Sequence, residues 1–372
     1  MVLEMLLSLA VVGCGEVLGT TGGDAGADRG QLDDGALRDG VSDGSRDGLP
    51  DAPPRDVAAD ISDEPSVCTI GGISVAADAR NPSEPCQICS PSRSATGWSA
   101  APTPVTLASG LPEPFRVAVS STTVYWTNLG GGGSLMSMPL AGGAITTLVA
   151  EGFPYWVSLG QMSVYFTTAA PGGGPVLSVP MSGGAPTTLA TGEQDGEIIV
   201  TGSTAYFTGV GSLSSVDIDG GTSVVIATHA GQSFAVDSFN AYYTESDSVL
   251  SIPLSGGMPT TLAAAGATGI AVDSTTVYWT SNGFPNSTVM SVPISGGASS
   301  TLVTASSGQE PSGPAVDAEY LYWSTPSAIE RLPVSGGAVA TFAVDDNPQQ
   351  VVLDSTCVYW VNDSGNIKTA AK

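Results

Sequence analysis

The chain has 372 residues, of which 42% are hydrophobic and 12% charged, so it is long and apolar enough to bury a large core. Its formal net charge of −25 repels phosphate backbones, which argues against nucleic-acid binding. The 48 glycines, together with many Ser, Thr and Val residues, favour short strands joined by tight turns.

The first 14 residues have the pattern of an export signal. An apolar run, Met5 to Val12, leads into Val-Val-Gly-Cys ending at Cys14. This ending resembles the lipobox of bacterial lipoproteins, which implies that Cys14 is acylated and that a lipid anchor is the only membrane attachment. No Lys or Arg precedes the run, and Glu4 stands where that pattern has a positive charge. The alternative is an ordinary secretory signal with a chance cysteine, and the run is too short to span a bilayer.

Residues 15–65 form an acidic low-complexity segment with 13 acidic residues, 4 basic residues and no aromatic residue. Such a composition buries too little apolar surface to offset its chain entropy. The Asp-Gly pairs in this segment lack the order of an EF-hand or of a repeat-toxin calcium site. We therefore predict a disordered linker.

Residues 66–100 contain Cys68, Cys86 and Cys89. Their C-x-I-x-G start and N-P-x-x-x-C-x-x-C-x-P-x-x-S-x-x-x-W end resemble a small Cys-rich module of exported myxobacterial proteins. That module has one more Cys near its start, so an odd thiol remains here, and a bond from it to Cys357 would complete two disulfides. Zinc at Cys86 and Cys89 is the alternative, although the module has no His to complete the ligand set.

From residue 101 onward the chain repeats a unit of 36–44 residues, which is the mark of a propeller or solenoid. Four strands are predicted per unit: an apolar strand A that often ends in Asp, a strand B of the VYWT type, a strand C such as MSMPL and a strand D such as TTLVA. The B strands carry Tyr125, Tyr165, Tyr206, Tyr242, Tyr278, Tyr322 and Tyr359. A Gly-Gly pair between strands C and D predicts a two-residue hairpin turn. The acids Asp237, Asp273, Asp317 and Asp354 are interpreted as turn formers.

The seventh unit stops before its strand D. The missing strand matches the start of the repeat region, because TPVTLASG at 103–110 is similar to APTTLATG at 185–192. We therefore predict an all-β fold over 101–372: a seven-bladed β-propeller of four-stranded blades, closed by pairing the first strand (103–108) with the C-terminal blade. Closure removes exposed strand edges, and the recurring aromatic residues become core.

The repeated Y-W-T element resembles the YWTD propeller repeat of low-density-lipoprotein receptors and their bacterial look-alikes, which implies a propeller with a binding role. That family has six blades, whereas seven are counted here. The fourth motif residue is never Asp in this chain, so the inter-blade Asp contacts of that family do not carry over.

A ligand face is expected at the D-to-A and B-to-C loops. The residues ten and nine positions before each motif tyrosine vary from blade to blade, either because a ligand shaped them or because they are unconstrained loop. The candidate ring is Phe115, Arg116, Tyr155, Trp156, Glu197, Gln232, Gln349 and Gln350. Tyr155 and Trp156 beside Arg116 and Glu197 suit a sugar. Nearby acids would suit Ca²⁺ or a basic protein segment, although no calcium motif supports this: Glu113, Glu151, Glu193, Asp195, Glu310, Asp345 and Asp346.

The resulting hypothesis is a monomeric, non-enzymatic binding protein, without a cofactor, at the cell surface or outer membrane. Its partner would be a protein or polysaccharide of the cell envelope. The alternatives are a secreted form, a structural envelope protein without a ligand, and a propeller lyase or hydrolase. Seven-bladed streptogramin lyases use a His with a nearby carboxylate, but the single histidine here, His229, has no carboxylate partner evident from its spacing.

Overall fold

The computed structural model describes residues 66–169, 173–192, 196–209, 211–231, 233–283 and 286–372, which fall in one compact unit. The predicted signal (1–14) with Cys14, the predicted linker (15–65) and the ring residue Gln232 lie outside the described residues, as do Glu193 and Asp195. The described part of the chain contains no helix with the length and apolarity needed to cross a bilayer.

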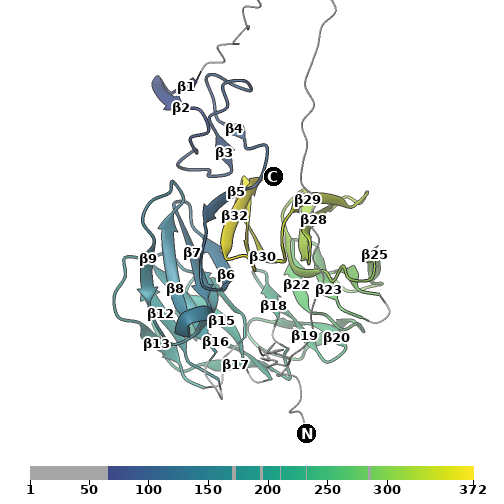
Figure 1. Ribbon diagram of the computed structural model, residues 1–372. Helices are drawn as coiled ribbons and strands as arrows, with labels where there is room; N and C mark the ends of the chain where they lie inside the picture. The colour runs from purple at the N-terminus through teal and green to yellow at the C-terminus, as the bar shows by residue number, and fades with distance from the viewer. Residues whose placement is uncertain (1–65, 170–172, 193–195, 210, 232, 284–285) are drawn as a thin grey trace, which may run out of the picture. The chain divides into compact units, whose positions relative to one another are not determined.

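Seven four-stranded antiparallel sheets form the propeller, which confirms the predicted fold class and blade count (Figure 1). Besides one short 3₁₀ turn, η1 (Gly130–Gly132), the described residues from 101 onward form no helix. Blades 1 to 3 consist of β6 (Pro114–Val119), β7 (Thr123–Asn128), β8 (Ser134–Pro139) and β9 (Thr146–Val149); β10 (Pro154–Leu159), β11 (Ser163–Thr168), β12 (Val176–Pro180) and β13 (Thr187–Ala190); and β14 (Ile198–Thr201), β15 (Thr204–Gly209), β16 (Ser212–Asp217) and β17 (Val224–Thr228).

Blades 4 to 6 continue the same order of strands along the chain. They consist of β18 (Phe234–Val236), β19 (Asn240–Glu245), β20 (Ser248–Pro253) and β21 (Thr260–Ala263); β22 (Gly269–Val272), β23 (Thr276–Ser281), β24 (Thr288–Pro293) and β25 (Ser300–Thr304); and β26 (Ser312–Val316), β27 (Tyr320–Thr325), β28 (Ala328–Pro333) and β29 (Ala340–Val344).

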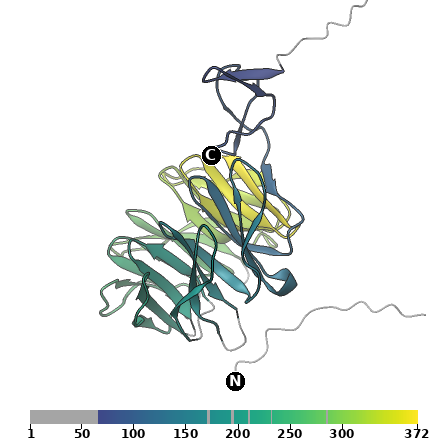
Figure 2. The ribbon, with the colours of Figure 1, turned by 90° about the vertical axis from the view of Figure 1, so that its left-hand side faces the viewer.

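Blade 7 joins the two ends of the repeat region. It contains β30 (Pro348–Leu353), β31 (Cys357–Asn362), β32 (Asn366–Ala371) and, as its outer strand, β5 (Val105–Ala108). β32 pairs with β5 in the register Ile367 to Ala108 and Lys368 to Thr106. Figure 2 shows the blue β5 against the yellow strands of the last blade. The predicted closure is therefore confirmed, with a strand that begins at Val105 instead of residue 103.

The VYWT motif supplies core side chains to both faces of every blade. In the first copy, Tyr125 packs with Phe166 of blade 2, whereas Trp126 packs with Tyr359 of blade 7. The same exchange recurs at each junction between blades, so seven separate clusters surround the ring. A strand buried on both faces needs continuous apolar residues, which explains why the motif does not alternate with polar ones.

The motif's Thr joins neighbouring blades. The Thr127 hydroxyl donates to the carbonyl oxygen of Tyr155 at 2.9 Å and accepts from the Arg116 amide at 3.2 Å. Thr167 makes the same pair of contacts one blade further on, with Gly196 and Trp156. Because this hydroxyl links the first strands of two blades, Thr supplies an inter-blade contact here.

The Asp at the end of strand A has a structural role. In blade 4, Asp237 Oδ1 accepts from the amides of Phe239 and Asn240, each at 2.7 Å, while Oδ2 accepts from the Tyr242 hydroxyl at 2.6 Å. Asp273, Asp317 and Asp354 also accept turn amides. The interpretation of these four acids as turn formers is confirmed.

The Gly-Gly pairs do not form two-residue hairpins, so that prediction was wrong. In blade 1, β8 ends at Pro139 and β9 begins at Thr146, which leaves a wider connection. Gly142 closes a β-turn by donating its amide to the carbonyl oxygen of Pro139 at 2.9 Å, with φ of 87°. Glycine is favoured there because a positive φ strains other residues.

The segment 66–100 is held by two disulfides, as predicted from the cysteine count. It contains two small hairpins, β1 (Val67–Ile70) with β2 (Ile73–Ala76), and β3 (Gln87–Ile88) with β4 (Ser99–Ala100). Cys68 bonds to Cys89, and Cys86 bonds to Cys357 in β31. Because Cys86 and Cys89 each have a disulfide partner, they do not form the alternative zinc site.

Candidate functional site

The site is built on the first strand of each blade. These first strands contact one another around the ring; for example, β6 contacts both β10 and β30. The D-to-A and B-to-C loops, which the sequence places on one face, contact each other. The Leu129 amide donates to the carbonyl oxygen of Glu113, and the Ala169 amide donates to that of Phe153. The registers of β6 and β10 shift at their starts, between Pro114 and Arg116 and between Pro154 and Val157. Such bulges re-aim side chains.

These shifts allow consecutive side chains to meet in one row. The Arg116 guanidinium carbon lies 3.7 Å from the ring centroid of Phe115 and 4.0 Å from that of Trp156. Phe115 in turn stacks on Tyr155, with ring centroids 4.7 Å apart and planes 26° apart. All four side chains are half-buried. With Glu197 they form what we call the axial cluster: Phe115, Arg116, Tyr155, Trp156 and Glu197.

The guanidinium of Arg116 forms only part of its possible hydrogen bonds with the described residues. Its Nη1 donates to the carbonyl oxygen of Phe115 at 3.0 Å, while its Nε is shielded from water and has no hydrogen-bond partner in the part of the chain that the structure describes. Burial lowers the pKa of Arg116 to about 10, and the nearby Glu197 and Tyr155 limit the fall. The guanidinium therefore remains positively charged at neutral pH.

Glu197 is the second ionisable group of the axial cluster. Its Oε2 accepts from the Ser233 hydroxyl and from the Phe234 amide, both at 3.2 Å. Burial raises the pKa of Glu197 to about 7, although the Phe234 amide, Arg116 and Ser233 oppose the shift. Its carboxyl group therefore changes charge near neutral pH, unlike an ordinary surface glutamate.

Two of the predicted ring residues form hydrogen bonds with partners outside the axial cluster. Gln350 Oε1 accepts the Val117 amide at 3.0 Å, across the seam between the last and first blades. Gln349 Nε2 donates to Asp363 Oδ1 at 2.9 Å in the neighbouring loop. Gln350 thus satisfies an inner-strand amide, as Glu197 does for Phe234. This role in satisfying amides of another blade could not be predicted from the sequence, because the partners are far apart along the chain.

The stacked row also changes the expected sugar contact. One face of Trp156 is covered by Arg116, and one face of Tyr155 is covered by Phe115. These rings therefore have less free surface for a sugar than the sequence indicated, and the prominent feature becomes the arginine held between aromatic rings.

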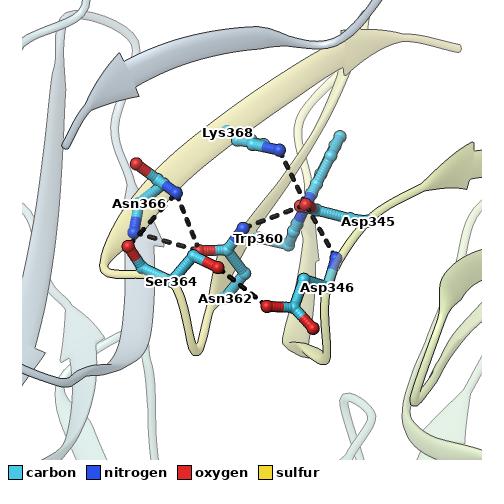
Figure 3. A network of polar contacts seen from close by, with 7 residues as sticks. All are labelled: Asp345, Asp346, Trp360, Asn362, Ser364, Asn366 and Lys368. Carbon is cyan, nitrogen blue, oxygen red and sulfur yellow. Dashed lines mark hydrogen bonds and ion pairs between the residues drawn. The ribbon is translucent and has the colours of Figure 1, made fainter. Parts of the chain in front are cut away.

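Of the predicted acidic residues, Asp345 is used inside the fold (Figure 3). Its Oδ1 accepts from Lys368 Nζ at 2.6 Å and from Asn362 Nδ2 at 2.9 Å, and its Oδ2 accepts from Trp360 Nε1. Burial alone would raise the pKa of Asp345, but the hydrogen bonds from Lys368, Trp360 and Asn362 bring it below its ordinary value. Within the described ranges, no group of three His, Cys, Asp or Glu residues is placed to hold a metal ion.

A His–carboxylate pair escaped the sequence analysis. His229 Nδ1 lies 4.0 Å from Glu245 Oε1, and the His229 side chain is 80% exposed. The two residues come from the connection before β18 and from the end of β19. Their separation along the chain shows no catalytic spacing, so only the fold reveals the contact.

Two cavities lie away from the axial cluster. One of about 380 Å³ is lined by the A-to-B turns of blades 4 and 5, including Asp237 and Asp273. In blade 4, both oxygens of Asp237 already accept hydrogen bonds. The other, about 140 Å³, lies between blades 5 and 6, with Tyr278 and Leu332 in its wall.

Comparison with known proteins shows the fold and no closer relationship. No family model matches the chain, and no curated protein matches it. A catalytically inactive virginiamycin B lyase from Staphylococcus aureus, solved with quinupristin, is similar with a TM-score of 0.60 at 15% identity, over 73% of this chain and 98% of that one. BamB from Moraxella catarrhalis has a TM-score of 0.52 at 12% identity, over 74% and 94% of the two chains.

PorZ, a surface component of the type-IX secretion system of Porphyromonas gingivalis, has a TM-score of 0.54 at 12% identity. The similarity covers 72% of this chain and 37% of PorZ. Propellers similar to this one thus include envelope and secretion proteins as well as an enzyme, and identities this low carry only the fold.

Proposed function

We propose that this protein is a non-enzymatic binding module of the cell envelope that contacts a partner protein through the axial cluster. The observation that carries the proposal is Arg116, whose guanidinium lies over the rings of Phe115 and Trp156 and whose buried Nε has no hydrogen-bond partner among the described residues. Buried polar groups are nearly always hydrogen-bonded, so one without a partner on a first strand, where neighbouring blades meet, favours a ligand as its partner. Arginine and aromatic residues are also enriched in the energetic centres of protein interfaces.

The proposed location follows from the cysteines. Two buried disulfides form and persist in oxidising compartments, which supports a position outside the cytoplasm. The lipobox-like sequence ending at Cys14 would then anchor a monomeric protein by acylation, and residues 15–65 would act as its tether. A protein partner is preferred to a polysaccharide because the stacked rings cover one another.

The test is capture of envelope proteins on the full chain, compared with two double variants. Arg116→Ala with Trp156→Ala removes the centre of the axial cluster. Phe239→Ala with Met258→Ala is the matched control, because it removes two exposed apolar side chains from turns elsewhere. A partner retained by the wild type and the control but lost by the cluster variant is expected. Equal capture by all three proteins would contradict the proposal, and no capture by any would favour the structural alternative.

Catalysis at His229 and Glu245 is a second candidate, supported by their 4.0 Å approach. Quinupristin is the probe, because the similar lyase was solved with it. Turnover by the wild type that His229→Ala abolishes would support catalysis. Absence of turnover of quinupristin leaves the binding proposal as the better account.

A further inference from the structure

The guanidinium of Arg116 presents one unused edge. Its central carbon lies over the rings of both Phe115 and Trp156, and Nη1 donates to the Phe115 carbonyl oxygen. Nε has no partner, and the hydrogen bonds of the described residues include none from Nη2. Nε and Nη2 lie on the same side of the planar group, so their hydrogens form a fork that matches two oxygens of one ligand group.

The fold does not require an arginine at this position. The equivalent residue, nine positions before the motif tyrosine, is Gly269 in blade 5 and Gly313 in blade 6. Both of those blades form complete four-stranded sheets without any side chain there. The placement of Arg116 between two rings is therefore an addition to the propeller, and the free fork is its distinctive chemical feature.

The net charge of the protein limits the chemical class of ligand that Arg116 can bind. A net charge of −25 repels a polyanion such as an acidic polysaccharide or a nucleic acid, whereas one carboxylate on a peptide brings only a single negative charge. A carboxylate is also planar, with two oxygens at the spacing of the guanidinium fork. Resting on the proposed function, we infer that the Nε–Nη2 edge of Arg116 binds a carboxylate of the partner protein, from an Asp or Glu side chain or from a chain terminus.

Glu197 gives this site a dependence on pH. The charged group that acts on Glu197 from the neighbouring strands is Arg116, and Tyr155 acts in turn on Arg116. An ionised Glu197 repels an incoming carboxylate and competes for the positive charge of Arg116, whereas the protonated form does neither. Since the pKa of Glu197 is about 7, affinity should fall as pH rises through neutrality.

The experiment follows the Arg116 Nε–H signal by NMR in the full chain labelled with ¹⁵N-arginine, and Arg116→Lys assigns the signal by its loss. N-acetylalanine represents a chain terminus. N-acetylaspartic acid α-amide, in which only the side-chain carboxylate is free, represents an acidic side chain. N-acetylalanine amide is the neutral control, and inorganic phosphate tests the rival oxyanion. We expect a saturable shift with at least one carboxylate and none with the amide at equal ionic strength.

The pH series separates carboxylate binding from a general salt effect. If only protonated Glu197 permits binding, affinity should be about tenfold weaker at pH 8 than at pH 6. Glu197→Gln should keep the shift and change affinity by less than about twofold over that range, because its side chain cannot ionise.

Each failure has its own meaning. No saturable shift with either carboxylate overturns this inference, and so does an equal or stronger response to phosphate. In both cases the proposed function stands if partner capture still depends on Arg116 and Trp156. If capture is the same in the cluster variant, the proposed function fails independently of the titration.

Discussion

The Cys86–Cys357 bond should be the main covalent stabiliser of the propeller. It spans a sequence separation of 271 residues, whereas the Cys68–Cys89 bond spans 21. In the chain-entropy model the longer loop contributes about 5–6 kcal/mol and the shorter one about 3 kcal/mol. Their difference of ~2 kcal/mol depends only on the ratio of loop lengths.

The perturbation is Cys86→Ala with Cys357→Ala, and the matched control is Cys68→Ala with Cys89→Ala. All four sulfurs are fully buried, so the packing losses are similar in the two variants. The first pair also fixes the segment before β5 to β31, beside the strand pairing that closes the ring. Its loss should therefore lower the free energy of unfolding of the propeller itself.

The assay is urea unfolding of the full chain, followed by the fluorescence of the buried propeller tryptophans Trp126, Trp279 and Trp360. The Cys86 and Cys357 variant should lose ~2 kcal/mol more than the control. A control that loses as much or more would refute the loop-length reasoning. A loss below about 2 kcal/mol in the Cys86 and Cys357 variant would show that β5 pairing closes the ring without the disulfide.

Three further predictions use the same unfolding assay. Gly160→Ala should cost about 1–3 kcal/mol, because its Cβ would lie 2.7 Å from a ring carbon of the buried Tyr165; an unchanged urea midpoint would contradict this. The raised pKa of Glu197 means that wild-type stability falls as pH rises from 4.5 to about 7, so Glu197→Gln should remove that slope in melts at pH 5 and pH 8; parallel slopes in both proteins would oppose it. Asp345→Asn leaves Lys368 without its ion-pair partner and should cost about 2–4 kcal/mol at pH 7, an effect that shrinks as pH falls below 3.8; a pH-independent difference would exclude the ion pair as its cause.

The architecture was predictable because its determinants are local and repeated. Each copy of the motif carries a strand that is buried on both faces, and each turn carries its own Asp or Gly. A strand or turn that is misassigned in one repeat can therefore be corrected by comparison with the other repeats. The closure was also visible, since β5 resembles the outer strand of the other blades. The Gly-Gly turns were misread because a positive φ is shared by several turn types, and the residue letters do not distinguish them.

The site was only partly predictable, because its contacts join residues from different blades. Gln350 and Val117 are 233 residues apart, and nothing in either local sequence indicates that they meet. Asp345 looked like a surface acid, but its oxygens bind Trp360 and Lys368 inside the last blade. The bulge that brings Phe115 and Arg116 into one row is likewise invisible without the register of β6.

The propeller uses most of its recurring polar groups to hold itself together, which narrows where a ligand can bind. The motif's Thr joins neighbouring first strands, and three motif tyrosines donate to the Asp of their own turn. Even Glu197 accepts a hydrogen bond from the next blade, through one of its carboxylate oxygens. Arg116 differs, because its guanidinium donates to the carbonyl oxygen of the preceding residue and, within the described ranges, its Nε has no hydrogen-bond partner. Arg116 is a positive group kept half-buried in a chain of net charge −25, at a position where two other blades have glycine, and this is what the inferred carboxylate ligand would require beside Glu197.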